Sequence, residues 1–215
     1  MRLMKKNLLV AGLLLVAAFA ARANGGLDAL DAFIKSAKSG RASFTQVVTA
    51  PSRDGQPART KTSSGTFEFQ RPSKFRFDYQ KPFEQVIVAD GQTLWLYDVD
   101  LNQVTSRNQN LVLGSTPAAV IASAPNLAAL SRNFNLEAAP DKDGLQWAVA
   151  TPKDREGQLN SMRVGLRGNE LVKLEIVDGF GQRSVITFEK MEINAAIPAE
   201  RFQFKPPQGA SVVKQ

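Results

Sequence analysis

The sequence predicts a mainly β protein with a few helices, built as one large curved antiparallel sheet or an open barrel. Two observations predict this fold. About ten short segments alternate apolar and polar residues at hairpin spacing, which is the pattern of half-buried antiparallel strands. Turn pairs such as Asp90-Gly91 and Asp143-Gly144 separate many of them. A helical stretch interrupts the series, and neither a linker nor an internal repeat divides it. We therefore expect a single domain over residues 24–215.

The first residues have the composition of an export signal. A basic start precedes an unbroken apolar run over residues 8–21, which is shorter than the roughly 20 residues needed to span a bilayer. Small residues at Ala21 and Ala23 suit cleavage after Ala23, and Ala20 is the alternative site. We expect residues 1–23 to be removed as a signal peptide and the mature protein to reside in the periplasm.

The composition excludes several classes of function. The 215 residues include neither cysteine nor histidine, which excludes serine–histidine and cysteine–histidine catalysis and removes the commonest metal ligand. The net charge of +7 lies partly in the signal peptide, and no clustered basic face indicates nucleic-acid binding. Residues 141–144 faintly resemble a calcium loop but lack its later acids. We expect no catalytic residue, no metal, no cofactor and no nucleic-acid partner.

The first elements are a helix, a strand and a loop. Apolar residues repeat at helical spacing from Leu27 to Ala37, and Gly40 is placed to end that helix. A strand follows over residues 41–50. Proline, glycine, serine and charged residues over 51–64 predict a mobile loop.

Strands then dominate the chain on either side of the helical stretch. The clearest hairpin has Asp90-Gly91 at its turn and apolar residues on both faces of its two strands. Within residues 110–130, Ser115-Thr116-Pro117 looks like a helix start and Pro125 an interruption, which predicts two or three short helices. The predicted strands are 65–71, 74–79, 83–89, 93–98 and 103–106, then 134–139, 145–151, 161–166, 170–178 and 183–193.

Aromatic residues gather on one face of two adjacent predicted strands. Phe67 and Phe69 alternate along the first strand, and Phe75, Phe77 and Tyr79 alternate along the second. Aromatic residues at this period usually form the core of a sheet, but they also fit the wall of a cavity for an apolar ligand. The pattern alone leaves both interpretations open.

Arg71 continues the same period. Counting by two from Phe67 and Phe69 places its guanidinium on the apolar face, where a charge must be paired or hydrogen-bonded. Its five donors suit carbonyls at the C-terminal ends of helices, which have no partner within the helix. Helices within residues 110–130 could supply them. The alternative is that the strand ends at Pro72 and Arg71 turns to solvent.

The segment 65–79, GTFEFQRPSKFRFDY, followed by Pro82, resembles the signature of the LolA family of periplasmic outer-membrane lipoprotein carriers. Further matches follow in order and cover nearly the whole mature chain. They are ASFTQ at 42–46, VADGQTLWLYD at 88–98 with Gln103-Val104, Thr116-Pro117, and FQFKPPQG at 202–209. Each match alone is weak, but the combination is specific.

The resemblance implies an unclosed antiparallel barrel of about 10–11 strands, with an N-terminal helix and a lid of short helices over a hydrophobic cavity. It also implies a non-enzymatic, monomeric carrier. Such a carrier accepts lipoproteins from the inner-membrane ABC transporter LolCDE, shields their acyl chains and delivers them to the outer-membrane receptor LolB. A soluble carrier of other acylated or lipid ligands in the cell envelope is the alternative.

The resemblance also assigns roles to single residues. Arg71 matches an arginine that hydrogen-bonds the lid in the closed, empty state, and Phe75 matches an aromatic residue important in handling the cargo. Phe77 stands where the family often has tryptophan. The expected acyl-chain cavity is lined by Phe67, Phe69, Phe75, Phe77, Tyr79, Trp95, Val120 and Ile121.

Overall fold

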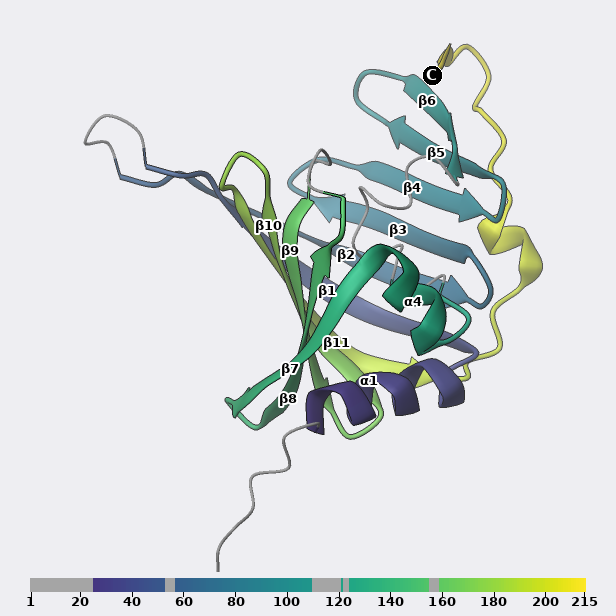
Figure 1. Ribbon diagram of the computed structural model, residues 1–215. Helices are drawn as coiled ribbons and strands as arrows, with labels where there is room; N and C mark the ends of the chain where they lie inside the picture. The colour runs from purple at the N-terminus through teal and green to yellow at the C-terminus, as the bar shows by residue number, and fades with distance from the viewer. Residues whose placement is uncertain (1–24, 53–56, 110–120, 122–123, 155–158) are drawn as a thin grey trace, which may run out of the picture.

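A computed structural model describes residues 25–52, 57–109, 121, 124–154 and 159–215. The predicted signal peptide, the helix start at 115–117 and Val120 lie outside these residues. The described strands form one twelve-stranded sheet in the order β12-β6-β5-β4-β3-β2-β1-β11-β10-β9-β8-β7. β12 and β7 are its two edges, so the sheet curves without closing (Figure 1).

The described helices are α1 (Gly25–Ser36), α4 (Leu127–Asn133) and a 3-10 helix, η2 (Ala199–Phe202). The first strands are β1 (Ser39–Thr49), β2 (Thr60–Gln70), β3 (Lys74–Lys81), β4 (Gln85–Asp90), β5 (Thr93–Asp98) and β6 (Gln103–Asn108). The remaining strands are β7 (Phe134–Lys142), β8 (Leu145–Pro152), β9 (Leu159–Arg167), β10 (Glu170–Asp178), β11 (Arg183–Ile193) and β12 (Ser211–Lys214).

The predicted fold class, a mainly β chain with an open antiparallel sheet, is confirmed. The sheet has one strand more than the upper end of the expected range, because β12 was not expected. β12 joins β6 in parallel, with Val212 opposite Val104. All the other neighbouring strands are antiparallel.

Two local predictions were wrong. The second half of the expected loop over residues 51–64 is strand, because Thr60–Ser64 pairs with Thr49–Thr45 of β1. The β1–β2 hairpin therefore extends beyond the rest of the sheet (Figure 1). Gly40 does not end the helix: α1 ends at Ser36, and Gly40 lies within β1. A Cβ at Gly40 would stand 2.5 Å from the ring of Phe69, so close packing of strand against ring requires glycine there.

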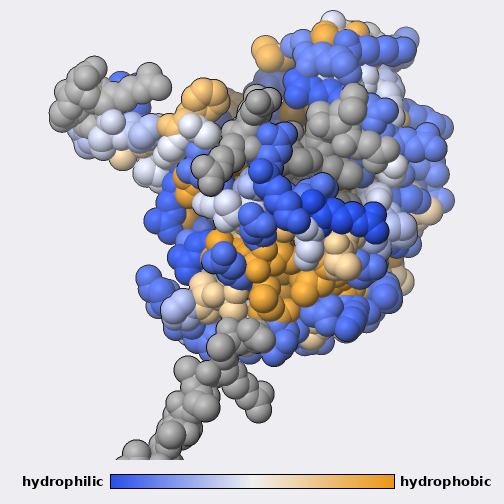
Figure 2. All heavy atoms as spheres, in the orientation of Figure 1, coloured by the Kyte–Doolittle hydropathy of each residue, from blue (hydrophilic) through white to orange (hydrophobic). Residues whose placement is uncertain are grey.

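The two faces of the sheet are covered by different parts of the chain. We call the face that α1 covers the inner face and the opposite one the outer face. α1 packs on β7, β8 and β9 and touches α4; it buries Leu30, Phe33 and Ile34, each worth about 1.5–3 kcal/mol. Figure 2 shows apolar side chains gathered where α1 and α4 lie. The C-terminal segment follows the outside of the sheet from β11 to β6 (Figure 1).

Candidate functional site

The predicted aromatic residues of β2 and β3 meet on the inner face. The register places Phe67 opposite Phe77 and Phe69 opposite Phe75, and the centroids of the Phe67 and Phe77 rings are 4.5 Å apart. These four side chains are at most 3% exposed. Tyr79 extends the row, with its ring 6.1 Å from that of Phe77. The strands therefore bring five of the predicted site residues into one continuous aromatic row.

Other elements add rings that the sequence analysis did not include in the site. Phe33 of α1 contacts Phe69 at a centroid distance of 6.0 Å, and Phe188 of β11 contacts Phe67 at 5.2 Å. Phe44 of β1 contacts both Phe77 and Tyr79. The signal was present in the sequence, since each of these residues lies on the apolar face of its own element. The pairing of β1 with β11, which brings Phe44 beside Phe188, links segments that are distant in the chain.

Arg71 lies at the end of this row and joins three segments. Its Nε donates to the carbonyl of Ala37 at 2.9 Å, directly after α1. Its Nη1 donates to the carbonyls of Ile121 at 2.8 Å and Ala124 at 2.7 Å. Of the two alternatives for this side chain, the contacts therefore match the one directed at carbonyls of residues 110–130 rather than the one directed at solvent.

The surroundings of Arg71 are apolar. Its guanidinium carbon lies 5.4 Å from the ring centroids of both Phe33 and Phe69, a distance at which cation–π attraction operates. Burial lowers the pKa of Arg71 to about 10, so the side chain remains charged at neutral pH. The backbone N–H of Arg71 donates to the carbonyl of Lys38 at 2.8 Å, which fixes the turn after β2 against the end of α1.

Two further predicted cavity residues, Ile121 and Trp95, lie in different parts of the structure. Ile121 is 1% exposed and belongs to the same apolar core as the aromatic row. Trp95 is not part of the row, and including it was wrong. It lies opposite Val88 on the outer face, contacts Phe204 at a centroid distance of 5.5 Å and donates from Nε1 to Asp90. Because β4 and β5 carry apolar residues on both faces, the alternation of apolar and polar residues does not predict which face of the sheet Trp95 lies on.

Tyr79 marks the point where the row becomes polar. Its hydroxyl donates to Oε1 of Gln46 at 2.9 Å, and Nε2 of Gln46 donates to the hydroxyl of Ser184 at 2.7 Å. Burial raises the pKa of Tyr79 to about 12. The row thus runs from a half-buried, hydrogen-bonded cation at Arg71 to a hydrogen-bonded hydroxyl at Tyr79.

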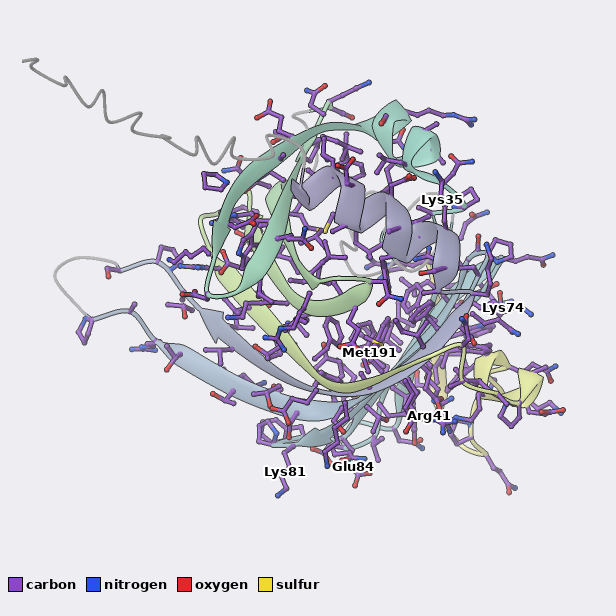
Figure 3. All side chains as sticks on the ribbon, turned by 90° about the horizontal axis from the view of Figure 1, so that it is seen from below. Lys35, Arg41, Lys74, Lys81, Glu84 and Met191 are labelled. Carbon is purple, nitrogen blue, oxygen red and sulfur yellow. The ribbon has the colours of Figure 1, made fainter. Side chains whose placement is uncertain are left out.

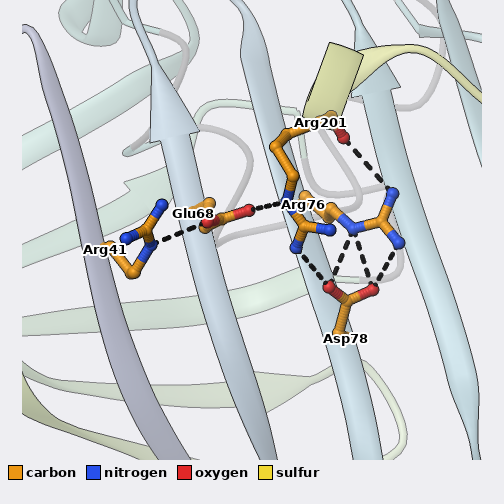
Figure 4. A network of polar contacts seen from close by, with 5 residues as sticks. All are labelled: Arg41, Glu68, Arg76, Asp78 and Arg201. Carbon is orange, nitrogen blue, oxygen red and sulfur yellow. Dashed lines mark hydrogen bonds and ion pairs between the residues drawn. The ribbon is translucent and has the colours of Figure 1, made fainter. Parts of the chain in front are cut away.

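An ionic network on the outer face was missed by the sequence analysis (Figure 4). Glu68, whose side chain is 5% exposed, accepts from Arg41 at 2.8 Å and from Arg201 at 2.7 Å. Arg201 also reaches Asp78, which pairs with Arg76. Burial opposes the charge of Arg201, but its hydrogen bonds and attraction to Glu68 and Asp78 outweigh that effect and raise its pKa. The network fastens η2 to the backs of β2 and β3.

Two further observations concern the described ranges as a whole. No helix in them is both long and apolar enough to cross a membrane. The acidic side chains in them form no group of three or more that could hold a metal ion.

Comparison with known proteins gives one consistent family. The family model "Outer membrane lipoprotein carrier protein LolA" matches residues 35–205. The outer-membrane lipoprotein carrier protein of Albidiferax ferrireducens is 63% identical over 205 residues, which are 93% of this chain and 96% of that protein. The protein of the same name from Methylibium petroleiphilum is 52% identical over 202 residues, which are 94% of this chain and 95% of that protein.

Solved structures of low sequence identity share the fold. The crystal structure of an uncharacterized conserved protein from Thermus thermophilus has a TM-score of 0.53 at 12% identity, covering 88% of this chain and 98% of that one. This likeness supports the open-sheet fold alone.

Proposed function

The chain belongs to the LolA family of outer-membrane lipoprotein carrier proteins, and from this premise we propose that it carries lipoproteins through the periplasm. It is a carrier rather than an enzyme. In this proposal it takes lipoproteins from the inner-membrane ABC transporter LolCDE, shields their acyl chains against the inner face and passes them to the outer-membrane receptor LolB. Mature carrier begins at Asn24, after removal of residues 1–23.

The observation that supports this function best is the covered aromatic row. Each CH₂ of an acyl chain gains about 0.8 kcal/mol by leaving water, so a lipoprotein needs an apolar surface to cross the periplasm. Phe67, Phe69, Phe75 and Phe77 form such a surface, and their rings contact one another in this state. Acyl chains would reach them by displacing Ile121 and Ala124, which belong to the same apolar core.

Arg71 makes that displacement reversible. Its hydrogen bonds to Ala37, Ile121 and Ala124 favour the covered state, in which the aromatic row is buried. Cargo binds only when these hydrogen bonds break and the row is uncovered. A ligand that binds only the uncovered state loses affinity in proportion to how rarely that state is populated. The carrier therefore releases its load to a receptor that offers a better site, and loading is driven by the ATP-using transporter.

A probe-displacement assay tests the proposed function. An apolar fluorescent dye bound to the purified mature protein should be displaced by a triacyl lipopeptide. Protein isolated from envelope extracts should hold diacyl or triacyl proteins, as read by mass spectrometry. Free fatty acids or phospholipids alone would instead favour the second candidate, a carrier of other envelope lipids.

Export is tested separately. N-terminal sequencing of the protein from a periplasmic extract should begin at Asn24. A chain that keeps Met1 and stays with the cytoplasmic fraction would contradict the periplasmic location.

A further inference from the structure

A pocket of about 400 Å³ opens at the end of the inner face opposite to Arg71. Arg71 precedes the start of β3, whereas the pocket lies at the end of β3, and Figure 3 shows Lys74 and Lys81 at these two ends. We call it the mouth pocket. It is lined by Gln46, Val48, Lys61, Ser63, Tyr79, Pro82, Phe83, Glu84, Gln85, Asp98, Asp100 and Leu101.

The rim of the mouth pocket exposes two large apolar side chains. Phe83, in the turn between β3 and β4, is 60% exposed, and Leu101, in the turn between β5 and β6, is 70% exposed. The two turns are joined, because the N–H of Val99 donates to the carbonyl of Glu84 at 3.2 Å. Exposed apolar side chains gathered at one pocket indicate contact with a ligand or partner.

The mouth pocket is continuous with the aromatic row. Tyr79 lines the pocket, and its ring contacts those of Phe44 at 5.0 Å and Phe77 at 6.1 Å. The Tyr79 hydroxyl donates to Oε1 of Gln46 at 2.9 Å. This polar pair is the boundary between the aromatic row and the pocket. An acyl chain lying along the row would place its ester or amide linkage near this boundary, and whatever follows the linkage would lie in the pocket.

Charges at the pocket distinguish its two walls. Lys61, on β2, lies with its Nζ 5.1 Å from the Phe83 ring centroid. Asp98 and Asp100 lie on the opposite wall beside Leu101, whose N–H donates to Asp98 at 3.1 Å. Lys81 and Glu84, at the two ends of the turn between β3 and β4, both point away from the sheet (Figure 3). The wall that carries Leu101 is therefore acidic.

We propose that the mouth pocket binds the first peptide residues after the acylated end of the cargo, and that its acidic wall favours basic residues there over acidic ones. The proposal rests on the proposed function and adds a specificity to it. Peptide leaving the row at Tyr79 passes over Phe83 and Leu101, and its charged side chains then lie beside Asp98 and Asp100.

Two matched lipopeptides test the charge preference. Both carry the same triacyl cysteine and serine, followed by four lysines in one and four glutamates in the other, and each displaces the dye from the mature protein. The Asp98→Asn/Asp100→Asn variant removes two charges from the pocket. The control variant Glu137→Gln/Glu170→Gln removes two exposed carboxylates from β7 and β10, outside the pocket.

We expect the lysine lipopeptide to bind about fivefold more tightly than the glutamate one at low salt. This ratio should fall toward one in the Asp98→Asn/Asp100→Asn variant and persist in the control variant. Equal binding of both lipopeptides by the unmodified protein, or an equal loss of the ratio in both variants, would overturn the charge preference and leave the carrier function standing. Failure of both lipopeptides to bind would instead overturn the carrier function.

The apolar rim is tested with a second pair of variants. Phe83→Ser/Leu101→Ser should weaken the binding of both lipopeptides by about tenfold, because the peptide loses its apolar contact area. Phe180→Ser removes another exposed phenylalanine, in the turn between β10 and β11, and should leave binding unchanged. Binding that is equally tight in the rim variant and the Phe180→Ser control would show that cargo peptide does not occupy the pocket.

Discussion

At the scale of the single residue, Arg71 joins the end of α1 and the turn after β2 to the carbonyls of Ile121 and Ala124. Hydrogen bonds from a charged donor contribute roughly 1.5–3 kcal/mol each. Arg71→Leu should therefore shift the protein toward the uncovered state. It should still accept lipoprotein from inner membranes but deliver it to the receptor at least tenfold more slowly, because closure no longer competes with cargo. A two-step transfer assay scores acceptance and delivery separately.

The lysine variant is the control for geometry. Arg71→Lys keeps the charge, but a single ammonium group cannot reach the carbonyls of Ala37, Ile121 and Ala124 in the way that a planar fork does. Its delivery should lie between those of the wild type and Arg71→Leu. Delivery by Arg71→Leu at the wild-type rate would show that these hydrogen bonds do not govern release.

Tyr79 predicts a pH dependence in the alkaline range. Burial raises its pKa to about 12 in the folded protein, whereas an unfolded tyrosine ionises near 10. The neutral hydroxyl therefore stabilises the fold below pH 10, and this stabilisation is lost as the pH rises from about 10 to 12. In Tyr79→Phe the free energy of unfolding should fall less steeply across that range. Urea unfolding at pH 9 to 12 measures the slope, and equal slopes in both proteins would contradict the prediction.

Single residues also show where sequence pattern suffices and where it fails. Alternation along β2 was enough to put Arg71 in phase with Phe67 and Phe69, because only one face of that strand is apolar. It failed for Trp95, since Val88 opposite to it and Leu94 beside it are both apolar. The choice between the two faces depends on Phe204, which approaches from the C-terminal segment.

At the scale of the element, η2 is held on the outer face through Glu68. Glu68→Gln should lower the free energy of unfolding by about 2 kcal/mol, because Arg41 loses its carboxylate partner and Arg201 keeps only Asp78. The loss stays below the value for a fully buried pair, since the side chains of Arg41 and Arg201 are 41% and 38% exposed. Urea unfolding measures the change, and limited proteolysis should cut near η2 sooner in the variant.

Glu175→Gln is the matched control. Glu175 also lies between two arginines, but its contacts to Arg163 and Arg183 are longer, at 3.6 and 3.1 Å, and its side chain is 16% exposed. We expect a loss below about 1 kcal/mol there. Equal losses in the two variants would mean that burial of Glu68 adds nothing to the attachment of η2.

Elements with a clear local pattern were predictable, whereas contacts between distant segments were not. The Asp90-Gly91 turn and α1 follow from residues within one short window. β12 was missed because its short strand pairs with β6, more than a hundred residues earlier. Glu68 and Arg201, which are 133 positions apart, could not be paired from sequence, although Glu68, Arg76 and Asp78 do alternate with the phenylalanines.

At the scale of the whole molecule, the two faces of the sheet are covered by different kinds of contact. The C-terminal segment is fixed to the outer face by the ion pairs of Glu68 and Asp78 and by the ring of Phe204. The inner face is covered through apolar contacts and the hydrogen bonds of Arg71. Acyl chains can make new apolar contacts in place of those that they break on the inner face. They have no charged group that could compensate for broken ion pairs on the outer face. Cargo should therefore open the inner face and leave the outer face closed.

Hydrogen exchange read by mass spectrometry tests this asymmetry. When triacyl lipopeptide binds, amides of α4 and of the last turn of α1 should exchange about tenfold faster, because local opening releases the carbonyls of Ala37, which follows α1, and of Ala124, which lies shortly before α4. Amides of η2 and β12 should keep their rates within about twofold, since their pairing partners lie on the outer face and at the sheet edge. Arg71→Leu without lipopeptide should show the same acceleration at α4. Faster exchange at η2 on loading, with α4 unchanged, would place cargo entry on the outer face and contradict a carrier that binds acyl chains along the aromatic row.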